Sequence, residues 1–69
     1  MRECIEYHMH KNPKLGDLVW HYYLCELNGP FIITEFNKNS KEWTLCDTAS
    51  FDIIVARSNS LRIPIIRRY

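Results

Sequence analysis

The stretch GDLVWHYYLC, residues 16–25, decides the fold class of this chain. It opens with Gly16 and Asp17, a pair typical of a turn. The residues that follow are rich in β-branched, aromatic and aliphatic side chains, which is the composition of a β-strand. Both faces of the expected strand 18–25 are apolar, so alternation alone does not decide which face points toward the core.

Strands are also expected on both sides of this stretch. Upstream, Ile5, Tyr7 and Met9 alternate with polar side chains, the pattern of a strand with one face in contact. A short helix over residues 2–11 is the alternative interpretation of that segment. Downstream, apolar or alternating runs predict strands over residues 31–36, 42–47, 52–57 and 61–63.

Turn residues separate these strands. Asn28-Gly29-Pro30 is the strongest turn signal in the chain, and residues 37–41 read as a polar loop. Further turns are expected at residues 48–50 and at residues 58–60, the second as a single 3₁₀ turn. Pro64 ends the last strand or places it on a sheet edge, because proline lacks the amide proton that a central strand donates.

This pattern predicts an all-β fold of five or six short antiparallel strands with at most one short helical turn. Strands this short and evenly spaced favour a small barrel or sandwich, and closing the sheet removes its exposed edges. A length of 69 residues allows one domain with a thin core and excludes a dinucleotide-binding fold or a (β/α)8 barrel. An apolar fraction of 46% excludes a disordered chain.

Several short motifs resemble those of the small SH3-like barrels. They are Gly16-Asp17-Leu18-Val19-Trp20, Gly29-Pro30-Phe31-Ile32-Ile33, Trp43-Thr44-Leu45, Ile54-Val55 and Ser60-Leu61-Arg62. The family that they resemble most is the C-terminal barrel of retroviral and retrotransposon integrases, over roughly residues 15–64. The resemblance implies an SH3-like barrel there, preceded by a strand or extension (residues 1–13) and followed by a basic tail (residues 65–69). It also implies that Val19 points inward.

Charge is unevenly distributed along the chain. Residues 57–69 hold four arginines and no acid, a net +4, whereas residues 1–56 are net −3, which together give the total of +1. The basic end predicts either a contact with an anion or a solvated tail that keeps an apolar edge soluble. The residues show no secretion signal and no membrane-spanning run, so we expect a cytoplasmic protein with reduced cysteines and no membrane partner.

Motifs of catalysis and metal binding are absent or weak. The chain has no phosphate-binding glycine loop, no nucleophile elbow and no CxxC pair, so we expect neither enzymatic activity nor a cofactor. The nearest nucleophilic pair would join Cys4 to His8 or His10. The same three side chains share one face of the first expected strand, which makes them weak candidates for a metal site. The alternative is that the two histidines form the polar face of an edge strand.

Aromatic side chains are the most informative set. They make up 13% of the residues, and a core this small cannot bury all of them. We expect at least two to be exposed, with Trp20 and Tyr22 as the first candidates. Exposed aromatic side chains anchor protein interfaces, and they also stack on unpaired bases.

The leading hypothesis is a non-catalytic module that docks on a protein partner. Such a module suits an accessory or inhibitor role, for instance one encoded by a phage or mobile element. Its partner-binding residues are expected to be Trp20, Tyr22, Tyr23, Arg57 and Arg62. The first alternative is nucleic-acid binding through Arg57, Arg62, Arg67 and Arg68. The second alternative is a small structural subunit of a larger assembly or a homo-oligomer.

Overall fold

A computed structural model describes residues 2–68 as six antiparallel strands and one 3₁₀ turn, η1. The elements are β1 (Glu3–Met9), β2 (Leu18–Tyr23), β3 (Glu26–Asn37), β4 (Glu42–Asp47), β5 (Ile53–Arg57), η1 (Ser58–Ser60) and β6 (Leu61–Arg68). The all-β fold class is confirmed. The first segment is a strand and not a helix, and η1 lies where the sequence predicts a 3₁₀ turn.

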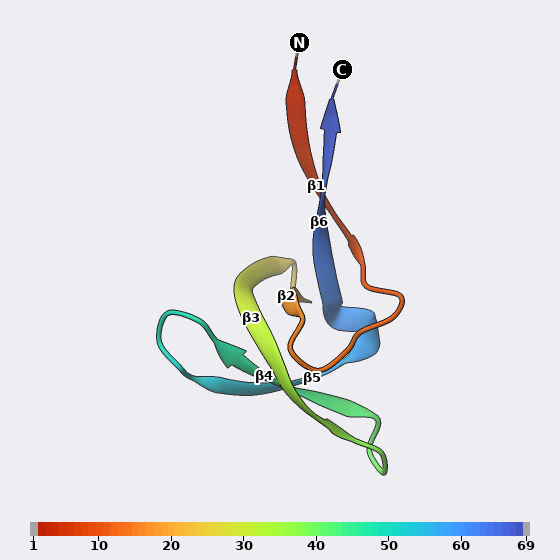
Figure 1. Ribbon diagram of the computed structural model, residues 1–69, viewed down its shortest axis with the longest axis vertical. Helices are drawn as coiled ribbons and strands as arrows, with labels where there is room; N and C mark the ends of the chain where they lie inside the picture. Colours follow the sequence, from red (N-terminus) through yellow and green to blue (C-terminus); the bar gives the residue numbers. More distant parts are fainter. Residues whose placement is uncertain (1, 69) are drawn as a thin grey trace.

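The six strands form one sheet in the order β1-β6-β2-β3-β4-β5, with β1 and β5 at its two edges. The sheet is open, so the expected closure into a barrel does not occur. Figure 1 shows why: β1 and β6 rise together as a two-stranded ribbon, away from β5, and the two edge strands never meet.

The molecule therefore has two regions. We call β1 and β6 the arm, and β2 to β5 with η1 the body. β6 pairs with β2 only at Leu61 and Arg62, and from Ile63 onward it pairs with β1 alone. The arm gives the molecule its elongated shape of 45 × 25 × 24 Å (Figure 1).

The last strand is longer than the sequence predicts. β6 continues through Pro64 to Arg68, so most of the segment expected as a basic tail is β-strand, and residue 69 lies outside the described residues. Pro64 is tolerated because this part of β6 has a neighbour on one side only, where a missing amide proton need not break a ladder.

The core lies in the body. Its buried side chains are Val19, Phe31, Ile33, Leu45, Ala56 and Leu61. Val19 is buried, as the resemblance to SH3-like barrels implied. Leu61 is the arm's contribution to this core, and it anchors the base of β6 to the body.

The turn expected at Asn28-Gly29-Pro30 is instead part of the long strand β3. The chain reverses earlier, at Leu24 and Cys25, whose φ angles are both positive at 50° and 62°. The glycine at position 29 serves another purpose, since a Cβ there would lie 2.7 Å from Cδ1 of Trp20. Gly29 thus marks the place where an indole ring crosses β3, opposite the irregularity in the pairing of β2.

Candidate functional site

Most of the exposed apolar side chains of the arm lie on one side of it. The cross-strand partners on this side are Ile5 with Ile66, Tyr7 with Pro64, and Met9 with Arg62. Trp20 of β2 continues the same side, because it is the partner of Arg62 on the opposite strand. We call this surface the arm face; it consists of Ile5, Tyr7, Met9, Trp20, Tyr22, Arg62, Pro64 and Ile66.

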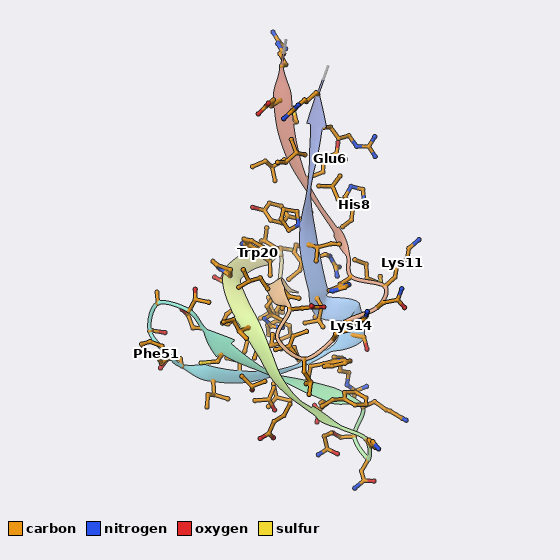
Figure 2. The ribbon with its side chains drawn as sticks, viewed as in Figure 1. Glu6, His8, Lys11, Lys14, Trp20 and Phe51 are labelled. Carbon is orange, nitrogen blue, oxygen red and sulfur yellow. The ribbon has the colours of Figure 1, made fainter. Side chains whose placement is uncertain are left out.

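Ring contacts hold the base of the arm face together. The ring centroids of Tyr7 and Trp20 are 5.5 Å apart, and the guanidinium carbon of Arg62 lies 5.2 Å from the centroid of the Tyr22 ring. Figure 2 shows Trp20 at the junction between arm and body. These contacts pack the aromatic rings against neighbouring side chains of the same chain.

The rest of the arm face is apolar and uncovered. Ile5 is 59% exposed, Tyr7 39%, Met9 52% and Ile66 60%. The alternation of β1 predicts a face in contact, but no part of the described chain covers it. Because an isolated two-stranded ribbon is only marginally stable in water, this surface is suited to contact with another molecule.

The opposite side of the arm carries a hydrogen-bonded group of charged side chains beside Ile63 and Ile65. The Glu6 carboxylate accepts hydrogen bonds from Nε2 of His8 at 3.0 Å and from Nε of Arg67 at 2.9 Å, on the side shown by the Glu6 and His8 labels in Figure 2. These contacts, with the His8 bond the largest, hold the pKa of Glu6 below its ordinary value. The two sides of the arm therefore differ. Exposed apolar side chains predominate on the arm face, which ends at the Glu3–Arg68 ion pair, whereas Glu6, His8 and Arg67 lie on the opposite side beside Ile63 and Ile65.

The four C-terminal arginines do not form one basic patch. Arg67 and Arg68 alternate on β6 and face opposite sides, and they pair with Glu6 and Glu3 respectively. Arg62 donates from Nη1 to the carbonyl oxygens of Asn59 at 2.6 Å and Leu61 at 3.1 Å.

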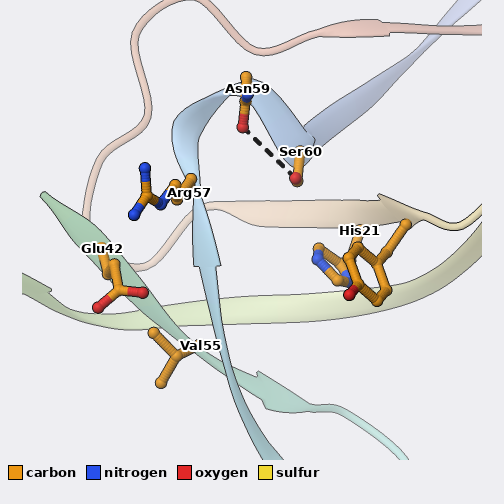
Figure 3. A pocket seen from close by; sticks show the side chains of 7 residues that line it. His21, Glu42, Val55, Arg57, Asn59 and Ser60 are labelled. Atoms are coloured by element: carbon orange, nitrogen blue, oxygen red, sulfur yellow. Dashed lines mark hydrogen bonds between the residues drawn. The ribbon is translucent and has the colours of Figure 1, made fainter.

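The fourth arginine, Arg57, lies in the body. It lines a shallow pocket of about 320 Å³ together with Tyr23 and residues of β2, β4, β5 and η1 (Figure 3). His21 stacks on Tyr23 there with centroids 5.8 Å apart, and burial lowers the pKa of His21. The Ser60 hydroxyl lines this pocket and donates a hydrogen bond to Oδ1 of Asn59 at 3.5 Å. An amide oxygen is not a general base, so this contact does not activate the hydroxyl as a nucleophile. The pocket is an open hollow at the surface and not an enclosed cavity.

The structure therefore divides the five predicted partner-binding residues. It brings Trp20, Tyr22 and Arg62 together on the arm face, and it places Tyr23 and Arg57 at the pocket. Tyr22 and Tyr23 are exposed, whereas Trp20 is half-buried between Tyr7 and Gly29.

The metal candidates Cys4, His8 and His10 are not assembled into a site. His8 pairs with Glu6, and His10 donates from Nε2 to the Asp17 carboxylate at 3.0 Å. The His10 bond, joined by the amide of Lys14, holds the pKa of Asp17 below its ordinary value. Among residues 2–68 no three His, Cys, Asp or Glu side chains gather closely enough to hold a metal ion.

Sequence reasoning missed Ile5, Tyr7, Met9 and Ile66 as site residues. Their alternation is visible in the sequence, but alternation predicts only that one face is apolar. Whether the chain itself covers that face depends on the pairing of β1 with β6 at the far end of the chain. The signal that could have identified the arm face is the surplus of apolar residues over what so small a core can bury.

Comparisons with family models, with curated proteins and with solved structures find no match to this chain. Within residues 2–68 no helix has the length and apolarity needed to cross a membrane.

Proposed function

We propose that this chain is a non-catalytic binding module that docks on a protein partner through the arm face. The observation that supports the proposal is a continuous apolar surface in which Ile5, Met9 and Ile66 are each more than half exposed. Contiguous apolar surfaces on small proteins are commonly interaction sites. The base of this one carries tryptophan, tyrosine and arginine, the residue types that anchor protein interfaces.

Charge indicates what kind of partner the arm face fits. Residues 2–12 and 61–68 carry five basic and two acidic side chains, a net +3. A surface with an apolar centre and an acidic rim is complementary to this combination, and the charges set orientation and association rate more than affinity. The module acts by occupying that surface, the mode of accessory and inhibitor proteins such as those of phages and mobile elements.

Nucleic-acid binding is the less well supported candidate. The resemblance to integrase barrels favours it, but Arg67 and Arg68 are paired with acids and Arg62 is bonded to backbone carbonyls. We therefore expect weak retention on DNA even at low salt. Tight binding whose affinity falls steeply as salt rises would favour nucleic acid instead.

A pull-down from nuclease-treated lysate of the source cell, quantified by mass spectrometry, tests the docking proposal. The test variant is Ile5→Ser with Ile66→Ser, and the matched control is Ile65→Ser, because Ile65 lies on the opposite side of the same strand. We expect one set of proteins to bind the wild type and the control, and to be lost with the double variant. Circular dichroism must show all three chains folded. Equal retention on all three chains would contradict the role of the arm face.

A further inference from the structure

A second exposed apolar surface crosses the outer side of the body. Cross-strand pairing places Leu18 beside Ile32, Ile32 beside Cys46, and Cys46 beside Ile53, so each of β2 to β5 contributes one side chain to a single row. Leu18 is 53% exposed, Ile53 68% and Val55, the next residue of β5 on that side, 56%. We call this surface the sheet face; it consists of Leu18, Ile32, Cys46, Ile53 and Val55.

The sheet face and the arm face match in length. From Ile5 to Met9 the arm rises ~13 Å at ~3.3 Å per residue, and a row across four strands ~4.8 Å apart spans ~14 Å. Laying the arm along this row would cross the two sets of strands at nearly a right angle. Orthogonal crossing is one of the two ordinary ways in which β-sheets pack face to face.

The two surfaces also match in charge. The arm, with the segments that flank it, is net +3, whereas residues 13–60 carry four basic and six acidic side chains, a net −2. Acidic side chains border the sheet face: Glu35 pairs with Thr44 next to Val55, and Asp52 immediately precedes Ile53. The arm segments of one molecule are therefore opposite in net charge to the body of another.

The chain exposes enough surface area beyond that of a compact protein to form such a contact. The chain exposes 5369 Å², whereas a compact protein of 8.3 kDa exposes about 4,600 Å². The excess of roughly 800 Å² equals what each partner buries in an interface of standard size. The radius of gyration is 12.6 Å, whereas a compact chain of this length has about 11 Å. We therefore ascribe the excess surface area to the projecting arm.

We infer that, when no other protein occupies it, the arm face packs on the sheet face of a second copy of this chain. The exchange is reciprocal, so each dimer has two identical arm–sheet contacts related by a two-fold axis and leaves neither surface open for further growth. The inference rests on the proposed docking role of the arm face and names a second copy as its occupant. The dimer then competes with any other partner for the arm face.

Sedimentation velocity of the full chain, from micromolar to hundreds of micromolar, tests the dimer. We expect a transition toward about twice 8.3 kDa. Ile5→Ser with Ile66→Ser on the arm face, or Leu18→Ser with Ile53→Ser on the sheet face, should each raise the dimer dissociation constant about a hundredfold or more. Ile65→Ser should leave it within a few-fold of wild type.

Mixing the two double variants distinguishes the reciprocal arrangement from others. A mixed dimer keeps one intact arm–sheet contact, so native mass spectrometry should show the heterodimer at concentrations where each variant alone is monomeric. A sheet-face variant that dimerises normally, or a mixture without heterodimer, overturns the arm-on-sheet arrangement. A wild type that stays monomeric throughout overturns self-association, and the pull-down then decides separately whether the arm face serves another protein.

Discussion

The body and the arm of this molecule use β-structure in opposite ways. In the body, Val19, Ile33 and Leu45 are almost wholly buried, and its four strands share one small core that Leu61 from the base of β6 completes. In the arm, every residue of β1 is at least partly exposed, and the ribbon relies on its backbone ladder and on ion pairs such as Arg67 with Glu6. The body therefore has the features of a folding unit, whereas the arm leaves most of its apolar side chains exposed.

This difference in burial predicts that substitutions in the body affect the stability of the fold and that substitutions in the arm affect contacts with another molecule. Burial of apolar area dominates the stability of a small domain, so the body's side chains carry most of the folding free energy. The arm's apolar side chains can contribute comparable free energy only once another surface covers them.

The largest expected effect separates the two regions directly. Leu45→Ala removes a fully buried side chain from the core and should cost about 3 kcal/mol, a large part of the stability of so small a domain. Ile66→Ala, in the exposed arm, should cost less than ~1 kcal/mol in the monomer. Urea unfolding followed by tryptophan fluorescence measures both, and similar losses would erase the distinction.

The second effect tests the contact at the junction of arm and body. Gly29→Ala places a Cβ 2.7 Å from Cδ1 of Trp20 and should cost about 1–3 kcal/mol while shifting the tryptophan emission. Gly16→Ala is the matched control, because it also has a positive φ but has nothing within 4 Å of the added carbon. A larger loss for Gly16→Ala would mean that backbone strain, and not the indole, requires glycine at position 29.

A smaller effect of opposite sign is expected at the hairpin between β2 and β3. Leu24 and Cys25 form its two-residue loop with positive φ, which asparagine and glycine adopt at lower cost. Replacing them together, Leu24→Asn with Cys25→Gly, should stabilise the fold by about 1 kcal/mol. Thermal unfolding checks this, and a lower midpoint would show that the exposed leucine packs on the body.

The smallest expected effect concerns pH at the junction. Asp17 has its pKa lowered from 3.8 by hydrogen bonds from His10 and the Lys14 amide, so the folded state holds its proton less tightly than the unfolded state. Its contribution to stability is present above about pH 4 and is lost as the pH falls through the lowered value. Asp17→Asn should flatten the fall in stability between neutral and acid pH, with Glu26→Gln as the control. An unchanged pH profile would mean that the bond between His10 and Asp17 does not stabilise the fold.

The sequence predicts the body better than the arm. Local signals place β4 and η1 correctly, because alternation and turn residues act over a few neighbours. They misplace the turn at Asn28-Gly29-Pro30, since the demand for glycine comes from Trp20 on another strand. They also leave the arm face undetected and the sheet open, because both depend on β1 pairing with β6 across nearly the whole chain.

Backbone hydrogen exchange, measured amide by amide on a dilute and a concentrated sample, tests most directly whether the arm is the interacting element. At low concentration we expect slow exchange in β3 and β4 and fast exchange in β1 and in β6 beyond Ile63. At high concentration, or with a captured partner, the arm amides should slow while those of β3 and β4 hardly change. Equal protection of arm and body in the dilute sample, unchanged by concentration or partner, would show that the arm is not the interacting element.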